Sequence, residues 1–229
     1  RLAHHDFVEL PNERLAWIQL ELGEATIDGE NLPIASDRIV EMDEGSSASE
    51  TVIFSFLDDY YAPYPTCDHF YADAFGTGAH DWTHANSLMY DDEDDAYFLM
   101  SKNLDALFKI DRTSGSLIWQ LGGDNSTLER IGAGSNFHHA HMSHRWDDGI
   151  LVFDNGYHTS PAQSRVVEYA IDEELGTYEQ IWEYPDPSGR FVQLLGDAQR
   201  LTDGNTLISW STAGLITEVN PNGDVVWQA

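Results

Sequence analysis

The chain has 229 residues, of which 41% are hydrophobic and 12% aromatic, so it can bury a core and is not a disordered chain. Forty acidic residues against eleven basic ones give a formal net charge of −29, which excludes nucleic acid and anionic membranes as partners. No run of about 18 apolar residues occurs, so the sequence predicts no membrane insertion.

The excess of acidic residues also bears on the source of the protein. A strongly negative surface suits a protein kept soluble at high salt, where screening weakens its self-repulsion. We therefore expect a halophilic or marine protein. An acidic secreted protein that binds calcium is the alternative.

Cys67 is the only cysteine, which excludes an intrachain disulfide and a thiolate metal cluster. A lone cysteine is more often a small buried residue than a nucleophile. The chain begins at Arg1, without an initiator Met or a signal peptide. We expect either a mature secreted protein, periplasmic or extracellular, or an excerpt of a longer chain.

Short runs of aliphatic and aromatic residues, bounded by Asp, Asn, Gly and Pro, predict β-strands along the chain. No apolar stripe of helical period exceeds about ten residues, so we expect an all-β fold. The runs recur in a fixed order, as a mixed polar strand, a hydrophobic strand, and a third and a fourth strand. The predicted third strands are 38–43, 106–111, 165–172 and 215–221, and the predicted fourth strands are 51–56, 116–121, 178–184 and 224–228.

Four repeats of four strands predict a β-propeller of four-stranded antiparallel blades. A β-sandwich is the alternative, although it would not require the same strand order to repeat. We expect residues 1–229 to form a single propeller domain, with long inter-blade loops at 60–83 and 122–137.

The segment HHAHMSH, residues 138–144, holds four of the ten histidines. When the first strands are aligned, His5, His84 and His141 share one position, and Gly196 takes it in the fourth repeat. First strands line the channel of a propeller, so we expect the three histidines to converge there. The strand period of two places His139 on the face of His141.

Other interpretations of these histidines stay open. Polar residues can simply line a wet channel. Three imidazoles could also bind Zn, Cu or Fe. In a non-catalytic binding propeller, exposed loops would carry the function instead.

Several motifs together resemble the arylsulfotransferase family of six-bladed propellers. They are DWTHANSLMYD, SKNLDALFKIDRTSGSLIWQLGG, FHHAHMSHRWDDGILVFDNG, SRVVEY and GDAQRLTDGNTLISWSTAGLITEVNPNGDVVW. The resemblance implies transfer of a sulfuryl group between phenols without a nucleotide sulfate donor. It implies small-molecule aryl sulfate and phenol partners, no cofactor, and a periplasmic location. A transition metal or calcium is the alternative cofactor.

The resemblance also implies site residues. It assigns catalysis to His84, His141 and Arg165, whose planar fork suits sulfuryl oxygens. It also implies substrate contacts by His5 and Asn86. The strand face predicted for His139 and the channel position expected for Trp82 make these two residues further candidates for substrate binding. Tyr157 and Phe137 are further aromatic residues that could stack on an aryl ring.

Two departures from the family pattern are visible. The loop 189–201, where the family has its nucleophilic histidine, contains none, so His141 is the predicted replacement. Four repeats are visible where six are expected, so the chain is either a portion of a six-bladed propeller or a shortened variant. Donor, acceptor and oligomeric state are not determined by the sequence.

The net charge generates a first prediction. The melting temperature should be higher in about 1 M salt than in about 0.1 M salt, because the Debye length falls from roughly 10 Å to roughly 3 Å. Thermal denaturation followed by circular dichroism would measure this. A melting temperature that stays constant or falls would contradict a halophilic source.

Overall fold

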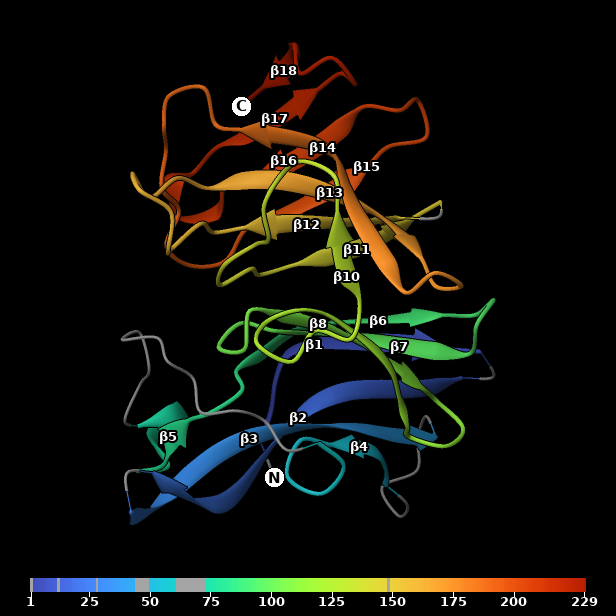
Figure 1. Ribbon diagram of the computed structural model, residues 1–229, viewed down its shortest axis with the longest axis vertical. Helices are drawn as coiled ribbons and strands as arrows, with labels where there is room; N and C mark the ends of the chain where they lie inside the picture. Colours follow the sequence, from blue (N-terminus) through green and yellow to red (C-terminus); the bar gives the residue numbers. More distant parts are fainter. Residues whose placement is uncertain (1, 12, 28, 44–49, 61–72, 148) are drawn as a thin grey trace. The chain divides into compact units, whose positions relative to one another are not determined.

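The computed structural model describes residues 2–11, 13–27, 29–43, 50–60, 73–147 and 149–229. In them, the repeated strand pattern forms four antiparallel sheets, each a meander of consecutive strands (Figure 1). The predicted all-β fold of four-stranded antiparallel blades is thereby confirmed. In the described part of the chain, no helix is long and apolar enough to cross a membrane.

The first two blades lie in the first half of the chain. Blade one contains β1 (Ala3–Leu10), β2 (Arg14–Ile27), β3 (Glu30–Asp43) and β4 (Thr51–Ser55), with β5 (His80–Asp81) added parallel to β3. Blade two contains β6 (Ala85–Asp91), β7 (Ala96–Ser101), β8 (Ala106–Asp111) and β9 (Leu117–Gly122). A 3-10 turn, η1 (Ala74–Gly76), precedes β5.

The other two blades follow the same plan. Blade three contains β11 (Ser143–Trp146), β12 (Gly149–Asp154), β13 (Arg165–Asp172) and β14 (Thr177–Pro185), with β10 (Glu129–Ile131) added parallel to β14. Blade four contains β15 (Asp197–Arg200), β16 (Thr206–Ser209), β17 (Ile216–Val219) and β18 (Val225–Gln228), and η2 (Ser211–Ala213) joins β16 to β17. The predicted third strands at 106–111 and 165–172 coincide with β8 and β13.

The chain divides into two compact units, residues 1–125 and 126–229, each with two blades. In the first unit β1 packs against β6, and in the second β11 and β12 pack against β15 (Figure 1). The first strand of one blade thus lies beside the first strand of the next, as in a propeller. The single domain expected over residues 1–229 stays a prediction.

Each unit has its own apolar core between its two blades. In the first unit the Phe56 ring meets the rings of Phe54 and Phe108 edge-on, with centroids 5.1 and 5.0 Å away. In the second unit Phe153 meets Trp210 at 5.7 Å. Edge-to-face aromatic pairs add to the free energy of burial, so the Phe56–Phe108 and Phe153–Trp210 contacts hold neighbouring blades together.

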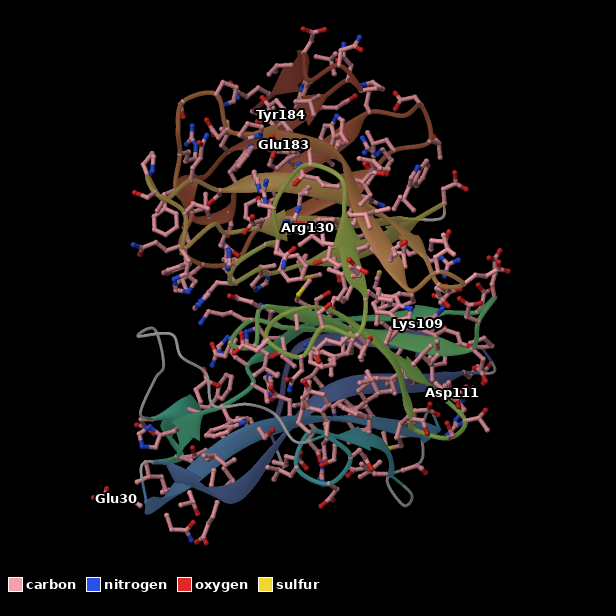
Figure 2. All side chains as sticks on the ribbon, viewed as in Figure 1. Glu30, Lys109, Asp111, Arg130, Glu183 and Tyr184 are labelled. Atoms are coloured by element: carbon pink, nitrogen blue, oxygen red, sulfur yellow. The ribbon has the colours of Figure 1, made fainter. Side chains whose placement is uncertain are left out.

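The basic residues of the chain are few, and several of them form contacts inside the fold. Both lysines of the chain, Lys102 and Lys109, are buried, and Lys109 (labelled in Figure 2) lies 2.7 Å from Asp94. Glu41 of β3 accepts hydrogen bonds from Arg112 and the Tyr97 hydroxyl, at 2.7 and 2.8 Å. Burial, followed by the bond to Glu41, raises the pKa of Tyr97 well above its usual value. This buried network joins blade one to blade two.

The structure revises the expectations for three segments. The segment 122–137 is not only a loop, because β10 pairs with β14 within it. Residues 138–142 are not in a strand, so the period-two argument that placed His139 on the face of His141 is wrong. In the segment 60–83 the structure forms η1 and β5, while residues 61–72, including Cys67, lie outside the described residues.

The first-strand alignment also needs refinement. His5 lies inside β1, at an irregularity between Ala3 and Phe7, whereas β6 begins directly after His84 and β11 begins two residues after His141. The fourth repeat has Gly196, whose φ is +112 and whose Cβ, if present, would lie 2.1 Å from the buried ring of Phe153. Close packing therefore excludes a side chain at this position.

This contact generates a stability prediction. Gly196→Ala should lower the free energy of unfolding by about 2 kcal/mol or more beyond Gly189→Ala, because overpacking adds to the cost of positive φ. Gly189 is the matched control, since it has φ +71 and a Cβ there would meet nothing within 4 Å. Urea denaturation of both variants would measure the difference. Equal losses would show that Phe153 moves aside without cost.

Candidate active site

The structure brings His5 and His84 together in the first unit. Their ring centroids lie 4.9 Å apart in an edge-to-face arrangement. His5 is exposed, and the His84 side chain is 17% exposed. Both have a left-handed backbone, with φ of 56 and 48, which is uncommon for residues other than glycine. Backbone strain of this kind often accompanies functional positions.

A buried carboxylate orients His84. Asp81 of β5 is 3% exposed, and its Oδ2 lies 2.5 Å from Nδ1 of His84. An ionised carboxylate only accepts hydrogen bonds, so Nδ1 of His84 carries a proton. In the neutral ring the lone pair is then on Nε2. The short strand β5 therefore fixes the tautomer of a histidine three residues further along the chain.

A second carboxylate acts on His5 through another histidine. His4 Nε2 lies 2.9 Å from Oδ1 of Asp37, and His4 Nδ1 lies 2.8 Å from Nδ1 of His5. Asp37 belongs to β3 and is 1% exposed. The two carboxylates thus anchor the histidine pair from two neighbouring strands. His4, Asp37 and Asp81 were not predicted. His4 and Asp81 lie one and three residues from His5 and His84, so the sequence offered a signal for them, whereas Asp37 reaches the site only through the pairing of β3.

Phe75 completes the cluster on its exposed side. It belongs to η1, is 45% exposed, and has φ 52. Its ring centroid lies 4.8 Å from that of His4, 6.0 Å from His5 and 6.2 Å from His84, with the His84 ring nearly parallel. An exposed aromatic face beside imidazoles suits stacking of an aryl group. Its position in a Gly-rich loop was the available sequence signal.

The other predicted aromatic contacts lie elsewhere. Trp82 is 7% exposed and belongs to the core of the first unit, and Phe137 is fully buried. Tyr157 packs on His139 and Phe191. Substrate contacts by these residues stay predictions.

Asn86 and Lys102 lie close to His84 along the chain and across the sheet. Asn86 is buried in β6, at an irregularity between Ala85 and Ser87. The backbone N–H of Lys102 donates to the carbonyl of His84 at 3.1 Å. Lys102 Nζ lies 3.5 Å from Asn103 Oδ1, and Asn103 Nδ2 donates to the Asp81 carbonyl at 2.7 Å. Lys102 is thus linked through Asn103 to the backbone of Asp81.

The second unit holds the other predicted histidines. The backbone N–H of His141 donates to the carbonyl of Phe153 at 3.0 Å, which fixes His141 beside the end of β12. His144 lies 2.8 Å from Asp197, so it joins blade three to blade four. Convergence of His141 with His5 and His84 stays a prediction.

His139 and His158 form a separate pair in the second unit. His139 is 2% exposed, and its Nε2 lies 3.2 Å from Nε2 of His158. These two nitrogens are close enough to share a metal ion.

Arg165 uses its donors within the protein. In β13 it donates from Nε to Asp154 at 2.9 Å, from Nη1 to Glu183 (labelled in Figure 2) at 2.7 Å, and from Nη2 to Ser135 Oγ at 2.8 Å. Nη2 also donates to the Asn136 carbonyl at 3.0 Å. The guanidinium therefore holds the segment 135–136 against β13. Its role in binding sulfuryl oxygens stays a prediction.

The Arg165–Asp154 pair is buried. Burial raises the pKa of Asp154 above its ordinary value, although Arg165 and the His138 and Gly156 N–H groups oppose the rise. Burial lowers the pKa of Arg165, but the attraction of Asp154 outweighs it and the net pKa is raised. The arginine therefore stays charged and compensates a carboxylate that is otherwise costly to bury.

Comparison with known proteins places the chain in a family. The arylsulfotransferase (ASST) family model matches residues 1–226. The chain therefore belongs to the arylsulfotransferase family, as its motifs predicted.

Individual relatives are more distant. The chain is 30% identical to arylsulfate sulfotransferase AssT of Escherichia coli and 32% identical to AssT of Lelliottia amnigena. Each match covers 52% of this chain and 25% of the relative, so the match spans about a quarter of the relatives' length. Among solved structures, the β-propeller domain of Cps50 (Swd1) from Myceliophteria thermophila is 10% identical, with a TM-score of 0.49 over 94% of this chain and 55% of that one.

The burial of Arg165 generates a further prediction. Arg165→Met should lower the free energy of unfolding by about 3–5 kcal/mol, because it leaves the Asp154 charge buried without its partner. Arg130→Met is the control, since Arg130 (labelled in Figure 2) is exposed and donates to the Gly134 carbonyl, and should cost about 1 kcal/mol. Chemical denaturation would measure both.

A double variant sharpens this test. Adding Asp154→Asn to Arg165→Met should recover part of the lost stability, because the unpaired charge is removed. An Arg165→Met protein of unchanged stability that loses activity would instead favour direct contact between Arg165 and substrate.

Proposed function

We propose that the protein transfers a sulfuryl group from an aryl sulfate to a second phenol, at a site in the first unit formed by His84, His5 and Phe75. Membership of the arylsulfotransferase family supports this reaction class. The observation that carries the proposal is the paired imidazoles, 4.9 Å apart, beside an exposed aromatic ring. His84 contacts the buried carboxylate of Asp81 directly, and His5 is linked to that of Asp37 through His4.

Transfer requires one proton to be removed and another to be supplied. The acceptor phenol forms a new S–O bond and loses its proton to Nε2 of His84. The donor S–O bond breaks, and its phenolate oxygen takes a proton from Nε2 of a protonated His5. The two imidazoles exchange protonation states, and solvent restores them. Histidine suits both roles because its ordinary pKa lies near neutrality.

Binding of the anionic substrate requires positive charge in a strongly negative protein. Lys102 supports this role because it is buried and linked through Asn103 to the Asp81 segment. Positive charge stabilises the oxygens of a transferring sulfuryl group as it does in phosphoryl transfer. Phe75 supports the proposal by offering an exposed face to an aryl ring.

The roles of the second unit, the localisation and the cofactor requirement are further parts of the prediction. His141, His139 and Arg165 belong to the second unit, and their part in the reaction is a separate prediction. A sulfated histidine intermediate at His141 is an alternative route for the sulfuryl group. We further propose a secreted or periplasmic protein that needs no cofactor and acts on small aryl sulfates and phenols.

His84 can be tested against a matched histidine. In the full-length protein, His84→Gln should lower kcat/KM by about tenfold or more, because the proton of the acceptor phenol loses its base. His144→Gln is the control, since His144 also pairs with an aspartate near a first strand and should stay within about twofold. Release of nitrophenolate from 4-nitrophenyl sulfate, with phenol as acceptor, would measure the rate.

Three outcomes decide between routes. Full activity of His84→Gln would contradict the acid–base role. Trapping of label from a ³⁵S donor on His141 would show a covalent route through the second unit. Absence of transfer by the full-length protein, across a range of phenols, would contradict the proposed reaction.

A further inference from the structure

Asp37 contacts residues next to both members of the histidine pair, His4 beside His5 and Thr83 and Ala85 beside His84, although it lies far from them in sequence. Its Oδ1 accepts from His4 Nε2 at 2.9 Å. Its Oδ2 accepts from the Thr83 hydroxyl at 2.7 Å and from the Ala85 backbone N–H at 2.5 Å. One carboxylate of β3 thus receives three hydrogen bonds, one from β1 and two from the residues on either side of His84.

The two bonds at Oδ2 hold the backbone around His84. His84 has φ 48, a left-handed conformation that costs a non-glycine residue about 1–2 kcal/mol. Such a conformation persists only where its surroundings enforce it. Asp37 fixes the residue before His84 and the residue after it, so this carboxylate contributes directly to the enforced conformation.

The bond at Oδ1 acts on His5 through His4. Because Asp37 only accepts, the proton of a neutral His4 lies on Nε2 and its lone pair lies on Nδ1. The 2.8 Å contact between His4 Nδ1 and His5 Nδ1 then requires a proton on Nδ1 of His5. The lone pair of a neutral His5 is consequently on Nε2. When His5 is protonated, the same chain connects its charge to the carboxylate of Asp37.

We propose that Asp37 is the positioning residue of the histidine pair: it sets the tautomer of His5 through His4 and holds the backbone of His84 beside it. The effect on turnover rests on the proposed function, whereas the effect on the tautomer does not. One buried side chain would thereby position two imidazoles so that the Nε2 atom of each can exchange a proton with a phenol oxygen. Conservative loss of its charge should therefore alter both histidines while leaving the fold in place.

Glu41 provides a matched control for Asp37. Both residues belong to β3, both are 1% exposed, and both accept several hydrogen bonds from other segments of the first unit. Glu41 binds Arg112 and Tyr97 rather than the histidines. Loss of a buried charge in β3 is thus common to Asp37→Asn and Glu41→Gln, and only the first concerns the site.

Histidine tautomers can be observed directly by long-range ¹H–¹⁵N NMR of the full chain, with signals assigned from His5→Gln and His84→Gln variants. We expect His5 to carry its proton on Nδ1 in the native protein and in Glu41→Gln, and to shift towards the Nε2–H form in Asp37→Asn. His4→Gln breaks the chain to His5 but leaves the Asp37 contacts with Thr83 and Ala85. It should therefore change the His5 signals and leave those of His84 in place, and it replaces Asp37→Asn if that variant does not fold.

Kinetics separate this proposal from the proposed function. Asp37→Asn should lower kcat by about tenfold with KM within about twofold, while Glu41→Gln keeps both. A His5 that keeps its Nδ1 proton in Asp37→Asn and in His4→Gln would overturn the positioning role, whatever the activity. A changed tautomer with unchanged turnover would support the positioning role and contradict the proposed use of His5 and His84 in transfer.

Discussion

The buried carboxylate of Asp37 joins β3 to two other segments, whose contacting residues lie 33 to 48 positions away from Asp37 in the chain. Burying an ionised carboxylate is costly unless donors surround it, and here a histidine, a hydroxyl and a backbone N–H do so. The arrangement requires β3 to be paired on both sides, with β2 along its whole length on one side and with β4 at Arg38–Glu41 and β5 at Ile34 and Ala35 on the other. The candidate site therefore depends on the sheet of blade one, because Asp37 of β3 holds the residues next to both histidines.

The chain is strongly negative and has few cations. Several of these cations form ion pairs within and between blades. Arg112 joins Glu41 of blade one to Asp95 of blade two, and Arg165 compensates Asp154 in blade three. Lys109 pairs with Asp94 at the edge of the same blade as Arg112. These contacts bind neighbouring strands and blades, and at least one partner of the Lys109–Asp94, Arg112–Glu41 and Arg165–Asp154 pairs is buried, which strengthens charge-assisted hydrogen bonds. Solvent-facing acidic residues then set the net charge of the surface.

Backbone strain and aromatic exposure coincide in the first unit. His5, Phe75 and His84 all have positive φ, and their rings lie within 6.2 Å of one another. The left-handed conformation directs each side chain where a regular strand would not place it. Carboxylate anchors on the buried side and an aromatic ring on the exposed side give the cluster two different faces. This arrangement suits a pair of imidazoles whose protons are fixed by carboxylates on the buried side and whose exposed side receives an aryl substrate.

The sequence by itself determined the repeated four-strand blades, the family, and the choice of His5 and His84 as candidate residues. Periodicity and turn residues act over a few positions, so they can be recognised from neighbouring residues alone. The bulge around His5, the added strands β5 and β10, and the irregular segment containing His139 depend on pairing between distant strands, which local patterns do not encode. Only the tertiary structure decided that Asp37 and Phe75 join the histidine pair and that His5 lies beside His84, because these contacts arise when β1, β3 and β5 bring separate parts of the chain to one place.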